Sequence, residues 1–232
     1  MAIIYGRAES EKELLKKYPK RVQKIEDIER VHQEMKEELM VKENGFFGHI
    51  KHWNKQRQVN KFEKNKNNPF HAGAKGELSV IDKLSELSDD YHVLCGLNIG
   101  LPYYVTYNGQ KNLRSAQMDF VVVSRKGVIL IEVKNWSTQY YNQHSDLSPH
   151  EQVDRAGRVL WLSLKSWRSP KSPRVTSVLL SIQDNMKYDP RYKFVSVSNL
   201  DKINYFIENR KEEFSDKEVK RIVDRLKGHV TK

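Results

Sequence analysis

The stretch from residue 117 to residue 136, QMDFVVVSRKGVILIEVKNW, decides the fold and carries the most informative polar side chains. Its two apolar runs flank Arg125-Lys126-Gly127, in which the glycine suits a left-handed bulge position. The pattern predicts a hairpin of two buried strands. Asp119 opens the first strand and Glu132-Val133-Lys134 closes the second. Charged groups inside buried strands are costly, so these residues indicate a functional site.

The acids and the lysine are expected to meet at one end of this hairpin. Side chains alternate between the faces of a strand, so Glu132 and Lys134 point the same way. A tight turn places Asp119 opposite either Glu132 or Val133, and the sequence does not decide which. The competing interpretation is an ordinary salt bridge between Glu132 and Lys134, with Asp119 at a strand edge. The apolar runs, which leave neither face of the strands polar, argue against it.

Two carboxylates a few ångströms apart repel each other, and a hard divalent cation with oxygen ligands relieves the repulsion. We therefore expect a Mg²⁺ site, which Mn²⁺ could also occupy. Such an ion polarises a phosphodiester and activates water. The lysine would balance charge, orient a water or stabilise a developing oxyanion.

The charge balance indicates a polyanionic partner. The 232 residues include 41 Lys and Arg against 30 Asp and Glu. Basic residues exceed acidic ones in 1–70 and in 138–232, whereas the two balance in 71–137. Basic flanks around a neutral centre suit binding of nucleic acid, with a solvated basic surface as the alternative.

The single cysteine, Cys95, excludes an intrachain disulfide and a cysteine-cluster zinc site, and it favours a reducing setting. Residues 2–5 are too short for a signal-peptide core, and no apolar run approaches the length of a membrane span. The sequence thus predicts a cytoplasmic protein that has no membrane partner.

Residues 1–70 are expected to form a helical extension. Apolar residues recur every three or four positions in residues 9–43, with Ser10 and Glu13 at capping-box spacing and Pro19 as a kink or restart. Residues 46–66 mix aromatic and basic residues in a second helical pattern. The extension is either a helical hairpin packed on the main domain or a partner-binding arm that could form homo-oligomers or contact nucleic acid.

Residues 71–232 are expected to form the main domain. A helix begins near Ala72, and strands are predicted at 91–99, 175–182 and 192–197, with a loop or loose hairpin at 100–116. Ser148-Pro149 starts a helix that continues to about Trp167, and Ser215 with Glu218 starts another. The order predicts an α/β domain with a mixed central sheet flanked by helices.

The central stretch resembles the nuclease-related domain (NERD) family of the PD-(D/E)xK nuclease superfamily. The resemblance covers roughly residues 72–185. It rests on the following residues: Gly73, Gly76 and Glu77; Gln117 and Asp119; Gly127; Ile131 to Trp136; Pro149 and Gln152. Phe120 departs from the histidine that the family often has after the aspartate. The resemblance implies a restriction-endonuclease-like fold.

The resemblance also implies roles for single residues. Asp119 and Glu132 would be metal ligands, with the Val133 carbonyl oxygen as a third. Lys134 would position or activate the attacking water. Glu77 would add an accessory carboxylate, although it also suits the helix dipole as an ordinary first-turn glutamate.

Contacts to the substrate are expected around the same site. Gln152 would touch the metal-bound water or the DNA backbone, or else be an ordinary polar residue near a helix start. The further candidates for nucleic-acid contact are Lys75, Gln117, Asn135, Arg155 and Arg158. Arg155 and Arg158 could track a phosphate backbone or form the solvated side of their helix.

These observations predict a Mg²⁺-dependent nuclease that hydrolyses phosphodiester bonds in DNA by metal-activated water. Two rival interpretations keep the same fold. One is a module that binds nucleic acid or a partner without cutting it, and the other is an oligomer of the N-terminal helices with a vestigial site. The sequence does not distinguish DNA from RNA, single from double strands, or endonuclease from exonuclease action.

Overall fold

A computed structural model of the 232-residue chain describes residues 1–41, 46–66, 70–135, 148–165, 173–183 and 186–231. The chain divides into two compact units. The larger unit contains residues 1–9 and 76–232, and the smaller one contains residues 10–75. Trp136, which contributes to the sequence resemblance, lies outside the described residues.

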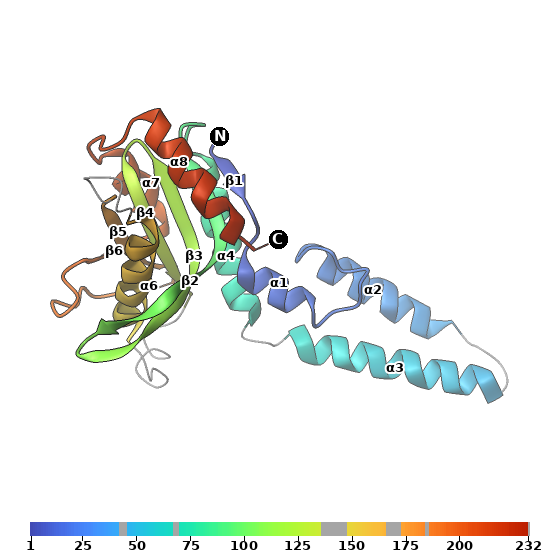
Figure 1. The fold of residues 1–232 in the computed structure, drawn as a ribbon. Helices are drawn as coiled ribbons and strands as arrows, with labels where there is room; N and C mark the ends of the chain where they lie inside the picture. The colour runs from blue at the N-terminus through green and yellow to red at the C-terminus, as the bar shows by residue number, and fades with distance from the viewer. Residues whose placement is uncertain (42–45, 67–69, 136–147, 166–172, 184–185, 232) are drawn as a thin grey trace. The chain divides into compact units, whose positions relative to one another are not determined.

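A six-stranded sheet forms the centre of the larger unit, in the spatial order β1-β2-β3-β4-β5-β6 (Figure 1). The strands are β1 (Ile3–Tyr5), β2 (His92–Tyr107), β3 (Gln110–Ser124), β4 (Gly127–Lys134), β5 (Val175–Ser181) and β6 (Val195–Asn199). The pairs β2–β3 and β3–β4 are antiparallel, and the other three pairs are parallel. The predicted mixed central sheet is therefore confirmed.

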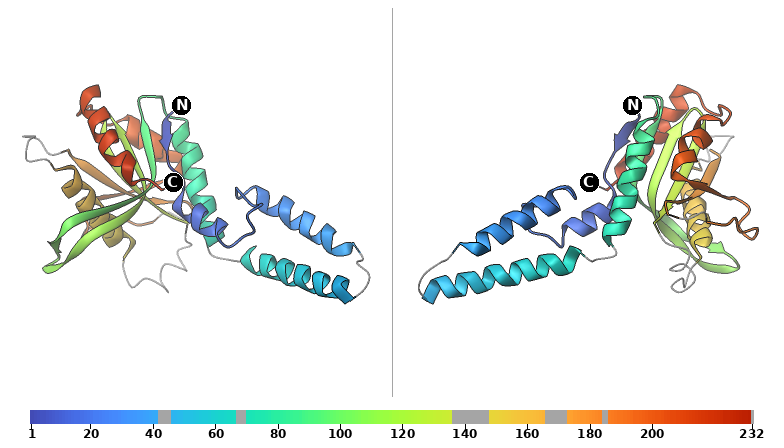
Figure 2. Two further views of the ribbon diagram at one scale, coloured as in Figure 1. Left: turned by 45° about the vertical axis from the view of Figure 1, so that its right-hand side comes forward. Right: turned by 180° about the vertical axis from the view of Figure 1, so that it is seen from behind.

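Helices cover both faces of this sheet (Figure 2). The helical elements that follow α3 are α4 (Phe70–Ser85), which belongs to the larger unit from Gly76 on, α6 (Pro149–Leu164), α7 (Ile203–Glu208), α8 (Asp216–Leu226) and the short 3-10 turns η1 (Leu200–Lys202) and η2 (Lys227–His229). Apolar stripes of α6 and α8 share one core with the sheet, whereas those of α4 and α7 share the other. Among the helices that the structure describes, none is long and apolar enough to cross a membrane.

The predicted central hairpin consists of β3, β4 and the turn that connects them. Every residue from Phe120 to Ser124 and from Gly127 to Ile131 is buried, as expected for strands covered on both faces. Of the two alternatives for residues 100–116, the structure shows the loose hairpin, whose β2–β3 pairing shifts register between Gly100 and Thr106. Residues 100–116 belong to β2 and β3, which Asn108 and Gly109 join in a tight turn with positive φ at both positions.

Several predicted element ends need correction. α1 begins at Glu9, so Ser10 lies inside the helix and is not its N-cap. Ser148 is the N-cap of α6 but makes no capping hydrogen bond with its side chain, while Ser215 and Glu218 form both bonds of the predicted capping box. β6 lies two to three residues later than predicted. The sequence pattern did not reveal β1, because three residues carry too little periodicity.

The smaller unit is helical, as predicted, and has its own core. Its helices are α1 (Glu9–Leu15), α2 (Asp27–Met40), α3 (Phe46–Lys66) and the first residues of α4. The core consists of Leu14, Tyr18, Val22, Ile28, Val31, Met35, Val59, Phe62 and Ala74. The break that Pro19 predicts is real, since α1 ends at Leu15 and α2 starts at Asp27.

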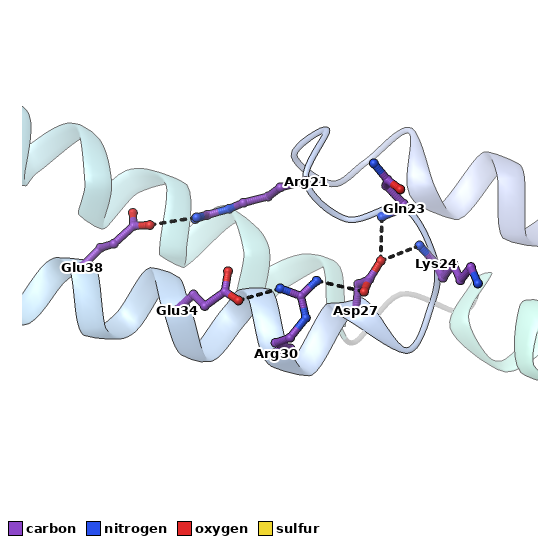
Figure 3. A network of polar contacts seen from close by, with 7 residues as sticks. All are labelled: Arg21, Gln23, Lys24, Asp27, Arg30, Glu34 and Glu38. Carbon is purple, nitrogen blue, oxygen red and sulfur yellow. Dashed lines mark hydrogen bonds and ion pairs between the residues drawn. The ribbon is translucent and has the colours of Figure 1, made fainter.

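Exposed ion pairs lie on the surface of this unit (Figure 3). Arg30 bridges Asp27 and Glu34 along α2, at 2.9 and 2.6 Å, and Arg21 pairs with Glu38 at 2.8 Å. Asp27 also accepts hydrogen bonds from the backbone N–H groups of residues 23 and 24, which fixes the turn before α2. Surface pairs of this kind contribute little each, so the apolar core carries the stability of the unit.

Gly96 of β2 combines a left-handed backbone conformation with close packing against other segments of the larger unit. Its φ is +60°, and a Cβ added there would lie 2.7 Å from the Thr231 Oγ1 and 2.9 Å from the Arg7 carbonyl oxygen. The Gly96 carbonyl accepts hydrogen bonds from the Thr231 N–H and hydroxyl, at 3.0 and 2.9 Å. The position thus ties the C-terminal residues to β2 and admits no larger side chain.

We predict that Gly96→Ala destabilises the protein. The left-handed conformation costs an L-residue about 1–2 kcal/mol, and the crowding against Thr231 and Arg7 adds to it, so we expect a loss of about 2 kcal/mol or more. Urea unfolding measures the loss. Gly100→Ala is the matched control on the same strand, because nothing lies within 4 Å of a Cβ there. Equal effects of the two substitutions would contradict this explanation.

Candidate active site

Glu132 and Lys134 end the buried strand β4 and point to the same side. The Lys134 Nζ donates to the Glu132 Oε1 at 2.8 Å, and the two side chains are only 12% and 13% exposed. The pair is therefore not a solvated surface salt bridge. Removing two charges from water costs free energy that their attraction offsets only with good geometry and further hydrogen bonds, so a buried ion pair is weak evidence for a stabilising role.

Asp119 lies where the sheet opens between β3 and β4. The β3–β4 ladder runs from Ser124–Gly127 to Phe120–Ile131 and pairs no residue beyond Phe120. Beyond that point the Asp119 Oδ2 accepts a hydrogen bond from the Val133 N–H at 2.7 Å. The carboxylate is thereby held against the backbone between Glu132 and Lys134. Continuing the observed register would place Asp119 opposite Glu132, which is one of the two arrangements that the sequence left open.

Gly96 explains the irregular backbone beside Asp119. The β2–β3 ladder pairs Cys95 with Phe120 and then Leu97 with Met118, so it passes over Gly96 and Asp119. Cys95 and Phe120 pack in the core under α4 and α7, whereas Leu97 and Met118 pack in the core under α6 and α8. Both strands therefore change faces at this point, and a glycine inside a strand is the sequence signal that could have revealed it.

Glu77 approaches the same place from α4. Its side chain is 6% exposed, and its charge contributes, after burial, to raising the pKa of the Cys95 thiol to about 12. Gly76 permits the approach, because a Cβ there would lie 2.9 Å from the Ile182 Cδ1 and 3.0 Å from the Asn135 Cβ. The tight packing of α4 on the ends of β4 and β5 thus brings a third carboxylate near the site.

The site carries more negative than positive charge. Burial first, and then the charges of Glu132 and Glu77, raise the pKa of Asp119 well above its ordinary value, against the opposing effects of Lys134 and the Val133 N–H. Burial opposes the charge on Lys134, but Glu132, Asp119 and Glu77 outweigh it and raise the lysine's pKa. Among the described contacts of Asp119 and Glu132, Lys134 is the cationic partner, and one ammonium does not neutralise two carboxylates. This arrangement would favour an additional cation.

The donor set fits a hard divalent ion that keeps several waters. In the part of the chain that the structure describes, no three His, Cys, Asp or Glu side chains are close enough together to hold one ion. The protein ligands would therefore be few. Mg²⁺ characteristically binds through one or two carboxylates and fills its other positions with water and phosphate oxygens.

The remaining predicted residues are more dispersed. Gln152 is partly buried on α6, one turn after Ser148, and none of the described contacts of Asp119, Glu132 or Lys134 involves it. Asn135 directly follows Lys134 and packs near Gly76.

The candidates for nucleic-acid contact differ in their surroundings. Gln117 is exposed on β3, two residues before Asp119. Arg155 and Arg158 lie over the rings of Tyr107 and Trp161, at 4.9 and 5.0 Å. Lys75 is exposed on α4 but belongs to the smaller unit, so its relation to the site is not defined.

The fold and the site define a mixed α/β domain with buried carboxylates and a lysine at the end of a central strand. Comparison with family models shows what this domain is similar to. Residues 72–181 match the model of the nuclease-related domain, NERD, which confirms the resemblance drawn from the sequence. The matched range runs from α4 to the end of β5 and includes Glu77, Asp119, Glu132, Lys134 and Gln152. No curated protein matches the chain.

We predict that Asp119→Asn stabilises the metal-free protein at neutral pH. Because folding raises the pKa of Asp119, its protonated form stabilises the fold below the ordinary aspartate pKa of about 3.9. That contribution is lost as the pH rises through the raised pKa. The neutral amide avoids the loss, so the variant should exceed the wild type in free energy of unfolding at neutral pH, and the advantage should shrink in acid.

Urea unfolding in EDTA over a range of pH measures this difference. Asp82→Asn, which removes the same charge from an exposed position of α4, should not reproduce it. A neutral-pH stability of Asp119→Asn below that of the wild type would show that the buried charge is fully compensated.

Proposed function

We propose that the protein is a Mg²⁺-dependent nuclease of the PD-(D/E)xK type that hydrolyses phosphodiester bonds in DNA. The observation that carries the proposal is the group Asp119, Glu132 and Lys134, largely withdrawn from solvent at the end of β4 with an excess of negative charge. The match to a nuclease-related domain supports the reaction class. The net charge of +11 supports a polyanionic substrate.

Asp119 and Glu132 would hold the ion, together with the Val133 carbonyl oxygen. The Val133 N–H supports this arrangement, because its bond to the Asp119 Oδ2 fixes one carboxylate oxygen and leaves the other for a ligand. Glu77 would act through water, as an accessory carboxylate. When bound, the ion would polarise the phosphodiester and lower the pKa of a coordinated water.

Lys134 would serve as a hydrogen-bond donor in this reaction. In the metal-free site the surrounding carboxylates raise its pKa, which favours the protonated ammonium over a role as proton acceptor. Its ammonium would instead orient the water or stabilise charge that develops on the phosphate oxygens. Gln152 and Asn135 would contact the substrate or water around this centre, and Gln117, Lys75, Arg155 and Arg158 are candidates for backbone contacts.

Plasmid, linear duplex, single-stranded DNA and RNA, each with Mg²⁺ or EDTA, test the activity. We expect cleavage with Mg²⁺ or Mn²⁺ and none in EDTA. Lys134→Ala should lower the rate about 10²- to 10³-fold, as expected for loss of a preorganised donor, and Asp119→Asn should abolish activity. Lys217→Ala removes an exposed lysine of α8 and should leave the rate unchanged.

Cleavage that survives both Asp119→Asn and Lys134→Ala would exclude this site. Salt-sensitive binding of nucleic acid with no cleavage under any metal would instead support the non-cutting module.

We predict that Mg²⁺ raises the unfolding temperature of the wild type, because the ion would relieve the repulsion among the carboxylates. Asp119→Asn should lose most of this gain, since it removes a ligand and part of the repulsion together. Differential scanning fluorimetry with increasing Mg²⁺ measures the shift, and Asp82→Asn should respond like the wild type. An equal shift in Asp119→Asn would place the bound Mg²⁺ elsewhere.

A further inference from the structure

A pocket of about 650 Å³ lies at the edge of the sheet, where residues of β6, η1 and α7 line it. β6 is the last strand in the sheet order, so among the described residues one of its edges has no neighbouring strand. The described residues that line the pocket are Met186, Tyr188, Val197, Ser198, Asn199, Lys202, Tyr205, Phe206, Asn209 and Arg210. None of these lining residues is acidic.

The pocket combines aromatic rings with cationic groups. Tyr205 is 72% exposed and Tyr188 is 56% exposed, so the faces of both rings are open to a ligand. The Arg210 guanidinium lies over the Phe206 ring at 5.8 Å, and its Nε is buried without a hydrogen-bond partner among the described residues. A buried donor of this kind is costly unless an acceptor reaches it.

The strand register connects this pocket to the candidate active site. Lys134 of β4 is paired with Ser181 of β5, and Ser181 is paired with Asn199 of β6. The three strands are parallel, so their carboxyl ends share one edge of the sheet. Two strand spacings separate Lys134 from Asn199, which is about 10 Å. Only the end of the pocket at Asn199 therefore lies near Lys134. From there α7 carries Tyr205 toward the other end of β4, where the N–H groups of residues 213 and 214 donate to the Arg125 carbonyl oxygen. A strand of nucleic acid at Lys134 would enter the pocket at Asn199 and follow α7 away from the candidate active site.

We propose that this pocket binds an unpaired nucleotide of the substrate, with its base stacked on Tyr205 and its phosphate held by Lys202 and Arg210. The identity of the ligand as substrate rests on the proposed nuclease function. Exposed rings recognise the faces of bases, which are accessible in single strands and covered in a duplex. The two cations complement a phosphate, and the absence of acidic groups among the described lining residues removes the main source of repulsion.

The proposed pocket thus assigns the enzyme a substrate class. It would act on single-stranded segments, such as free ends, gaps or flaps, in preference to uninterrupted duplex. A protein strand added to the open edge of β6 would be the other occupant of such a site, but it would not need both cations and the exposed rings.

Fluorescence anisotropy of labelled single-stranded and duplex DNA tests the proposal, with the full-length protein in EDTA so that cleavage plays no part. We expect tighter binding of the single strand. Tyr205→Ala should weaken that binding about tenfold, as for loss of one stacking ring, and Tyr205→Phe should retain it. Lys202→Ala should weaken it as well and lower its dependence on salt concentration. Phe194→Ala, which removes an 82% exposed ring outside the pocket, should have no effect.

Three results would overturn the assignment. The first is that Tyr205→Ala binds single-stranded DNA as tightly as the wild type does. The second is that Phe194→Ala weakens single-strand binding as much as Tyr205→Ala does, and the third is that Tyr205→Ala weakens duplex binding as much as single-strand binding. The binding assay separates this inference from the proposed activity. Single-strand binding that depends on Tyr205 without any cleavage would retain the pocket and reject the nuclease. Cleavage by a protein whose single-strand binding does not depend on Tyr205 would retain the nuclease and reject the pocket.

Discussion

The hydrogen bond from the Val133 N–H to the Asp119 carboxylate is the interaction on which the site depends. It forms where the β3–β4 ladder has ended, so a side chain takes a backbone donor that would otherwise lack a partner. The bond fixes Asp119 beside Glu132 and Lys134 and fills the opening between two buried strands. Without it, the carboxylate would be both buried and free to turn away from its neighbours.

Bringing carboxylates together at this point lowers the stability of the metal-free protein. Burial and the charges of Glu132 and Glu77 raise the pKa of Asp119, and Lys134 compensates only in part. The surrounding core tolerates the cost, because β3 and β4 are buried on both faces and α4 packs closely through Gly76. The same imbalance that weakens the fold would give the site the affinity for a cation that we propose, and it would link stability, metal binding and the proposed activity.

The parallel arrangement of β4, β5 and β6 organises one edge of the sheet. Their paired carboxyl ends carry Lys134, Ser181 and Asn199, so the acidic site and the end of the pocket at Asn199 are held at a fixed separation. The acidic centre would suit a metal ion and a phosphate, whereas the pocket would suit a base and a further phosphate of the same strand. Together they describe how one nucleic-acid strand could be held for hydrolysis at a defined point.

The sequence by itself determined the local features of this protein. It predicted the β3–β4 hairpin, the shared face of Glu132 and Lys134, the start of α6 and the capping box of α8, because each follows from residues close together in the chain. The tertiary structure decided the position of Asp119, since a strand register depends on both neighbouring strands. It also decided the roles of Gly76 and Gly96 and the place of β1. These depend on close approaches between segments far apart in sequence, for which a single sequence carries no periodic signal.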